Sequence, residues 1–246
     1  MFNNINNCSG NGRNEEIGSN GCDFLLLDLC FDAKLLHTDY AKVKDKKWIP
    51  HFQKNDYDGD WDVLALYSDK GNENAVFTEQ RDPEPTAILQ HCDYFKLVCR
   101  SFEAPILSAR ILKLKAGSEI KEHTDYKASY ADGIMRIHVP VITDPDVSFF
   151  INGKQVAMIP GDCWYGNFSL PHSVVHHGLE DRVHIVIDLE RNDWTDELMK
   201  RSGYDFSCEK DKLPIDVVKR MIGELELSEM PAAAVIVNQL KEQYGI

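Results

Sequence analysis

The chain has 246 residues, 43% of them hydrophobic, with a formal net charge of -13 and a pI of about 5.1. This length suits a single catalytic unit with a sizeable core. The strong negative charge argues against nucleic acid or an anionic membrane surface as a partner, and it means that an anionic substrate would need a local basic pocket.

The N-terminal segment, residues 1–21, is rich in Asn, Gly and Ser and has almost no large apolar side chains. Such a composition cannot bury enough surface to offset the entropy of ordering, so we expect a flexible segment. It lacks the apolar core of a signal peptide, and the longest apolar run, at 24–31, is too short to span a bilayer. We therefore expect a soluble protein that is neither exported nor bound to a membrane.

The seven cysteines are odd in number and include no C-x-x-C pair. This pattern does not indicate a disulfide framework or a zinc knuckle. It favours a protein of the reducing cytoplasm.

Two helices are expected before residue 107. Residues 32–43 have helical spacing of their apolar side chains, and a second helix opens at Thr86 as the N-cap residue. The second helix carries an apolar stripe of Ile88, Cys92, Phe95 and Cys99. We expect both helices to brace the domain that follows.

Short alternating segments begin near Leu107 and continue to residue 190. In VSFFINGKQVAMI, residues 147–159, two apolar runs flank Asn152 and Gly153, the dipeptide that best tolerates a type I′ hairpin turn. About eight such segments predict a mainly β fold with flanking helices, built on a double-stranded β-helix of the jelly-roll or cupin-like kind.

The pattern becomes helical again after Trp194. We therefore divide the chain into a flexible segment (1–21), a barrel domain with N-terminal bracing helices (22–194) and a C-terminal helical extension (195–246). The extension would form a lid or the contact of a homodimer. Its first long helix has one apolar face, formed by Ile215, Val218, Met221, Ile222 and Leu225.

A histidine and an aspartate two residues apart lie in one of the expected strands. Side chains at i and i+2 point to the same side of a strand, so His123 and Asp125 could bind one metal ion. A third ligand would come from a distant strand, where His172, His176 and His177 are candidates. Two histidines and one carboxylate that leave three positions open are typical of non-haem Fe(II) oxygenases.

Two further strands carry polar side chains on one face. Arg182 shares a face with His184, and Arg136 shares a face with His138. Polar groups inside a barrel are unfavourable unless they meet a ligand or one another. Such an iron centre could bind a 2-oxoacid dianion such as 2-oxoglutarate, and an arginine is suited to its far carboxylate.

These motifs resemble the aspartyl/asparaginyl β-hydroxylase family of Fe(II)- and 2-oxoglutarate-dependent dioxygenases, which includes bacterial proline cis-4-hydroxylase. The matching pieces are RILKLKAGSEIKEHTD, RIHVPV and GDCWYGNFSLPHSVVHHGLEDRVHIVIDLERNDW, between Arg110 and Trp194. YDGDW at 57–61 resembles a segment that precedes the barrel in such proteins.

The resemblance implies an assignment for each ligand. In the family the histidine of the LPH element is the distal iron ligand, and the arginine that binds 2-oxoglutarate follows ten residues later, which selects His172 and Arg182. The HxD pair maps onto His123 and Asp125. One departure concerns His176, where related sequences often have asparagine.

The resemblance also implies how the co-substrate and the substrate are held. His138 would help to bind 2-oxoglutarate, Arg136 would face a substrate carboxylate, and Arg110 would line the pocket. The implied reaction uses Fe(II), 2-oxoglutarate and O2, hydroxylates an unactivated carbon of an amino acid, and releases succinate and CO2. A free, carboxylate-bearing amino acid is preferred to a peptidyl residue, because the chain has no evident module that recruits peptides.

Two other functions fit the same barrel. A cupin-fold sensor or binding module would hold a metal and a small acid without turnover. A metal hydrolase or isomerase would work without oxygen.

Overall fold

The computed structural model describes residues 19, 21–77, 82–209, 213–228, 230, 233–244 and 246. The predicted flexible segment, 1–21, lies outside the described residues except for positions 19 and 21. The chain divides into two units, Met1–Asp205 and Phe206–Ile246.

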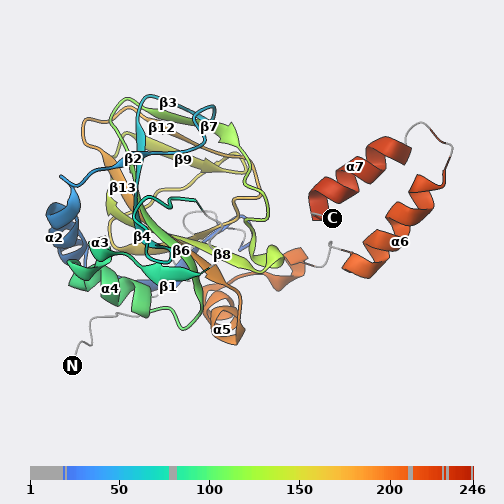
Figure 1. The fold of residues 1–246 in the computed structure, drawn as a ribbon, viewed down its shortest axis with the longest axis horizontal. Helices are drawn as coiled ribbons and strands as arrows, with labels where there is room; N and C mark the ends of the chain where they lie inside the picture. The colour runs from blue at the N-terminus through green and yellow to red at the C-terminus, as the bar shows by residue number, and fades with distance from the viewer. Residues whose placement is uncertain are drawn as a thin grey trace. The chain divides into compact units, whose positions relative to one another are not determined.

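The first unit contains two antiparallel β-sheets (Figure 1). The eight-stranded sheet has the order β1 (Phe24–Cys30), β11 (Asp162–Gly166), β8 (Ile134–Ile142), β13 (Arg182–Glu190), β6 (Ile106–Leu114), β4 (Trp61–Asp69) and β2 (Ile49–Pro50), and β5 (Pro83–Pro85) also pairs with β4. The five-stranded sheet has the order β10 (Lys154–Gln155), β9 (Val147–Ile151), β12 (His172–His176), β7 (Glu119–His123) and β3 (Tyr57–Asp58).

One hydrophobic core joins the two sheets. Val63, Leu112 and Val186 of the larger sheet belong to the same buried cluster as Phe149 and Val174 of the smaller one. Each strand alternates between this core and its other face, as sheet packing requires. The predicted fold class, mainly β with flanking helices, is confirmed.

The larger sheet starts earlier in the chain than predicted. β1 pairs with β11, and β4 pairs with β6 along most of its length. The segment before residue 107 therefore supplies strands to the barrel as well as helices. Both strands are mostly buried and contain apolar runs, FLLL in β1 and VLAL in β4, whose periodicity does not separate a strand from a buried helix.

The helices of the first unit agree in part with the prediction. α2 (Ala33–Val43) begins after Asp32, whose carboxylate accepts the N–H groups of Lys34 and Leu35. The helix predicted from Thr86 is instead two helices, α3 (Ala87–Gln90) and α4 (Asp93–Arg100).

A long-range contact marks the start of α4. Asp39 of α2 accepts the N–H groups of Tyr94 and Phe95 at 2.6 and 3.0 Å, and so acts as the N-terminal cap of a helix more than fifty residues away. Thr86 makes no side-chain cap, because its hydroxyl donates to Ala65 O.

The predicted hairpin at Asn152 and Gly153 is confirmed. Both residues have positive φ, 49° and 71°, and they join β9 to β10. The second strand is shorter than predicted, because it ends at Gln155 and residues 156–159 are irregular.

The first unit extends beyond the predicted boundary at residue 194. α5 (Asp193–Ser202) is capped by Asn192 through a capping box and packs on β1. The second unit holds α6 (Ile215–Glu226) and α7 (Ala233–Tyr244), which lie side by side in Figure 1 and share a small cluster of Val218, Ile222 and Val237. None of the helices in the described part of the chain could serve as a membrane span.

The cysteines differ from the prediction. Cys22, Cys30 and Cys208 are disulfide-bonded, whereas Cys92, Cys99 and Cys163 are buried free thiols. The view that the cysteines form no disulfides is therefore wrong for three of them, because disulfide pairing depends on tertiary proximity that spacing in the sequence does not reveal. The cysteines therefore no longer support the predicted cytoplasmic location.

Candidate active site

Strand pairing brings the three predicted metal ligands together. β12 pairs with β7 so that His172 lies directly opposite His123. Asp125 follows β7 by two residues, and its backbone N–H is fixed by Phe168 O at 2.8 Å. One ligand atom from each of His123, Asp125 and His172 lies within 4.8 Å of the other two.

Both imidazole rings are oriented by backbone carbonyls. Nδ1 of His123 lies 2.8 Å from Lys121 O, and Nδ1 of His172 lies 3.0 Å from Leu170 O. A carbonyl only accepts, so Nδ1 donates in each ring and Nε2 is the nitrogen that would bind a metal. Burial lowers the pKa of His172 to about 4, so this ring stays neutral near pH 7.

Asp125 presents one oxygen to the histidines. Its Oδ2 pairs with Nη1 of Arg136, while Oδ1 lies 3.7 Å from Nε2 of His123. Burial raises the pKa of the Asp125 carboxyl, but Arg136 and the two histidines outweigh it and the net shift is downward. An ionised carboxylate beside the Nε2 atoms of two imidazoles fits a divalent ion such as Fe(II).

The neighbouring histidines have other partners. Nε2 of His176 lies 2.7 Å from Glu180 O, and Nδ1 accepts the Gly178 N–H at 3.1 Å. His177 is exposed. Neither ring has the orientation of His172, which is the only one of the three candidates to join His123 and Asp125 within the described residues.

All seven predicted site residues line one cavity of about 260 Å³. Its wall also contains aromatic and apolar side chains that the sequence did not single out, among them Phe149 and Phe168. The predicted residues on this wall are Arg110, His123, Asp125, Arg136, His138, His172 and Arg182.

Arg182 is a buried cation without a carboxylate partner among the described residues. It is 3% exposed, and its side chain contacts the ring of Phe149 and His184 Nδ1, the latter at 3.2 Å. Burial lowers the pKa of its guanidinium to about 9. A buried, unpaired charge is unfavourable, so this position favours the binding of an anion.

His138 lines the same cavity as Arg182 and has a ring nitrogen that could bind a ligand. Its ring stacks on Phe168 at 4.9 Å, and its buried Nδ1 has no hydrogen-bond partner within the described residues. Burial holds the pKa of His138 well below its usual range, so the ring is neutral. A neutral imidazole can donate one hydrogen bond to an anion held by Arg182.

Asp188 is a site residue that the sequence reasoning missed. On β13 it follows Arg182 at an even interval, so it faces the same side, and the sheet register places it between Ser108 and Arg136. It is 2% exposed and accepts from Ser108 Oγ at 2.9 Å, Arg110 Nη2 at 3.1 Å and Arg136 Nε at 2.6 Å. This carboxylate fixes two of the three cavity arginines.

Replacing Asp188 by asparagine is expected to destabilise the fold by about 3–5 kcal/mol, because it leaves Arg110 and Arg136 buried without their shared counter-charge. Denaturant unfolding measures the change, with Glu190→Gln, on an exposed position of the same strand, as control. Adding Arg110→Met to Asp188→Asn should recover part of the loss. Equal stability of Asp188→Asn and the control would refute this role.

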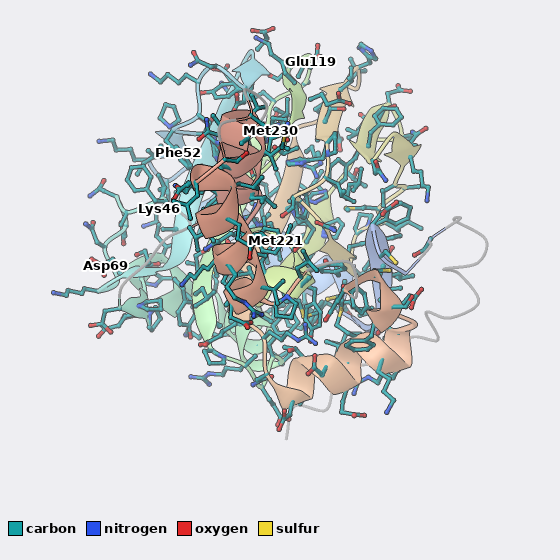
Figure 2. The ribbon with its side chains drawn as sticks, turned by 90° about the vertical axis from the view of Figure 1, so that its right-hand side faces the viewer. Lys46, Phe52, Asp69, Glu119, Met221 and Met230 are labelled. Carbon is teal, nitrogen blue, oxygen red and sulfur yellow. The ribbon has the colours of Figure 1, made fainter. Side chains whose placement is uncertain are left out.

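An aromatic stack that includes His51 lies on the cavity wall. The ring of His51 lies 3.6 Å from that of Trp61 and 4.7 Å from that of Phe52, near parallel to both. Trp61 and His51 are buried, whereas Phe52, labelled in Figure 2, is 40% exposed. Trp61 ends the YDGDW segment that the sequence analysis compared with the family, but no local pattern in the sequence indicates that His51 lies on this cavity.

Two imidazoles and a carboxylate, in one cavity with a buried arginine that has no carboxylate partner among the described residues, form the kind of site found in Fe(II)- and 2-oxoglutarate-dependent oxygenases. The family model for aspartyl/asparaginyl beta-hydroxylase matches residues 31–192. The chain therefore belongs to the aspartyl/asparaginyl β-hydroxylase family, and this membership supports a 2-oxoglutarate-dependent oxygenase. No curated protein matches the chain.

Solved structures of related fold share little sequence with this chain. A 2OG-Fe(II) oxygenase family oxidoreductase from Burkholderia pseudomallei is 16% identical and covers 67% of this chain and 81% of its own, with a TM-score of 0.47. A Pseudomonas putida prolyl-4-hydroxylase is 10% identical and covers 72% and 96%, with a TM-score of 0.45. HygX from Streptomyces hygroscopicus, solved with nickel and 2-oxoglutarate, is 15% identical and covers 74% and 87%, with a TM-score of 0.42.

Proposed function

We propose that this protein is an Fe(II)- and 2-oxoglutarate-dependent dioxygenase that hydroxylates an unactivated carbon of a free amino acid. The observation that carries the proposal is the buried guanidinium of Arg182, which has no carboxylate partner among the described residues and lies in the same cavity as the His123, Asp125 and His172 cluster. A diacid that chelates a metal at one end needs a cation of this kind at the other.

The protein's own residues would hold the reactants in place. His123, Asp125 and His172 would bind Fe(II), Arg182 would receive the far carboxylate of 2-oxoglutarate, and His138 would donate a further hydrogen bond. Iron, 2-oxoglutarate and O2 together supply the oxidising power for hydroxylation, with release of succinate and CO2. The apolar walls, including Phe149 and Phe168, exclude water from the bound oxoacid.

The cavity charges favour a substrate with a carboxylate. Three arginines and Asp125 line the cavity, and the buried Asp188 accepts from two of these arginines, so this group of five keeps one positive charge although the whole chain is strongly negative. A divalent ion and a dianionic oxoacid add no net charge, so one positive charge remains, which attracts the carboxylate of a substrate. This is the local basic pocket that the composition requires.

Arg110 is the better placed of the two arginines predicted for the substrate. Arg136 already donates to Asp125 and Asp188, so it orients a metal ligand. Arg110 uses one terminal nitrogen on Asp188, and its buried Nε has no partner within the described residues. We therefore assign the substrate carboxylate to Arg110 and a positioning role to Arg136.

The size of the cavity supports a compact substrate. Ligand pockets usually enclose about 300–1,000 Å³, and this cavity of about 260 Å³ must also accept the oxoacid. A free amino acid therefore fits better than a peptidyl residue.

A homodimer through the C-terminal helices and a cytoplasmic location stay predictions.

Succinate release tests this function. The protein, supplied with Fe(II), ascorbate, 2-oxoglutarate and a panel of free amino acids in air, should form succinate faster with at least one of them, and the product should gain the mass of one oxygen. Tight binding of 2-oxoglutarate without succinate under any condition would indicate a binding module. Turnover under nitrogen with zinc or manganese would indicate a hydrolase or an isomerase.

A further inference from the structure

His51 is a neutral hydrogen-bonding group held rigidly on the cavity wall. Its ring is stacked between Trp61 and Phe52, its edge contacts Tyr57, and its side chain is 3% exposed. Its backbone is fixed too, since its N–H donates to Trp61 O at 2.7 Å. Yet the buried Nδ1 has no partner within the described residues, which is unusual for a buried polar atom.

The nitrogen of a bound amino acid would need an acceptor in this cavity. Asp188 already accepts from Ser108, Arg110 and Arg136. Asp125 accepts from Arg136, and its other oxygen faces the metal ligands. Neither carboxylate is thus left to accept a hydrogen bond from a substrate ammonium group.

A neutral imidazole supplies the missing acceptor without adding a charge. One of its two nitrogens carries a proton and the other accepts. Burial, together with the positive charges of Arg110 and Arg136, lowers the pKa of His51 to about 3, so the ring stays neutral near pH 7. His51 and Arg110 line the same cavity, and the carboxylate and nitrogen of an α-amino acid are joined to a single carbon.

We propose that His51 accepts a hydrogen bond from the nitrogen of the substrate amino acid while Arg110 binds its carboxylate. The two contacts fix the substrate at adjacent atoms and decide which carbon faces the metal. The inference rests on the proposed function, because it names the residue that distinguishes an amino acid from a simple carboxylic acid. Gln53, which also lines the cavity beside the exposed Phe52, is the competing acceptor.

Binding of L-proline and of cyclopentanecarboxylic acid, the same ring without the nitrogen, tests this role. Calorimetry under nitrogen with Mn(II) and 2-oxoglutarate present measures both affinities without turnover. Wild type should prefer L-proline, and His51→Phe, which keeps the aromatic stack, should weaken L-proline binding about ten- to a hundredfold and leave the analogue unchanged. His51→Gln should retain part of the preference, because its amide oxygen can accept, and the control Gln53→Leu should retain all of it.

Three outcomes would overturn the inference: wild type with no preference for L-proline over the analogue, including binding of neither; equal weakening of both ligands by His51→Phe; or loss of the preference in Gln53→Leu instead. Failure of the proposed function looks different. In that case the binding preference and its dependence on His51 persist, but no amino acid stimulates succinate formation in air.

Discussion

Replacing His172 by alanine is expected to abolish both iron binding and turnover. His172 supplies one of the three ligand atoms gathered within 4.8 Å, and neither His176 nor His177 joins this cluster in the described part of the chain. Mutation of a residue that hydrogen-bonds a metal ligand typically reduces metal affinity about 10- to 100-fold. Loss of the ligand itself should therefore reduce the affinity by more than that. Equilibrium dialysis against Fe(II) under nitrogen measures the affinity.

His176→Ala is the matched control on the same strand. Its affinity for Fe(II) should stay within about twofold of wild type, because both ring nitrogens of His176 contact backbone groups, Glu180 O and Gly178 N–H. Its fold should lose about 1–3 kcal/mol, since these two backbone groups lose their partner. A protein that loses iron in His176→Ala and keeps it in His172→Ala would show that the ligand is wrongly assigned.

Replacing Arg182 by methionine is expected to weaken 2-oxoglutarate binding by about two to three orders of magnitude, because the far carboxylate would be buried without a counter-ion. The side chain is otherwise paired with no carboxylate of the described residues, so its removal should not cost the ligand-free protein an ion pair. Calorimetry with Mn(II) under nitrogen measures the affinity. Saturating 2-oxoglutarate should raise the Tm of wild type and not that of the variant.

Two further variants test whether the loss of 2-oxoglutarate affinity depends on the guanidinium group of Arg182. Arg182→Lys keeps the charge but not the planar fork, so it should fall between wild type and Arg182→Met. Arg100→Met, on an exposed position of α4, should bind 2-oxoglutarate like wild type. Unchanged affinity in Arg182→Met would remove this residue from the co-substrate site.

The cavity could be predicted in large part because its residues lie on strands. Period-two alternation places His123 with Asp125, Arg136 with His138 and Arg182 with His184, and each pair shares one face of its strand. The same rule places Asp188 on the strand face of Arg182, so the sequence could have indicated that this carboxylate belongs to the site. The hydrogen bonds of Asp188 with Ser108, Arg110 and Arg136 depend on which strands pair and in which register, and the sequence alone does not predict that.

The features that sequence analysis missed depend on contacts between distant segments. Asp39 caps α4 from another helix, and His51 enters the cavity wall by stacking on Trp61. The disulfide-bonded cysteines have no motif at short range. Strand β1 is an apolar run broken only at Asp28, since most of both its faces is buried.

Anomalous diffraction from crystals grown with Mn(II) and 2-oxoglutarate under nitrogen would test the central claim most directly. The claim requires one metal peak bounded by Nε2 of His123, Nε2 of His172 and a carboxylate oxygen of Asp125, with the far carboxylate of the oxoacid on Arg182. A metal bound elsewhere, or an imidazole of His172 turned away from the other two ligands, would contradict it.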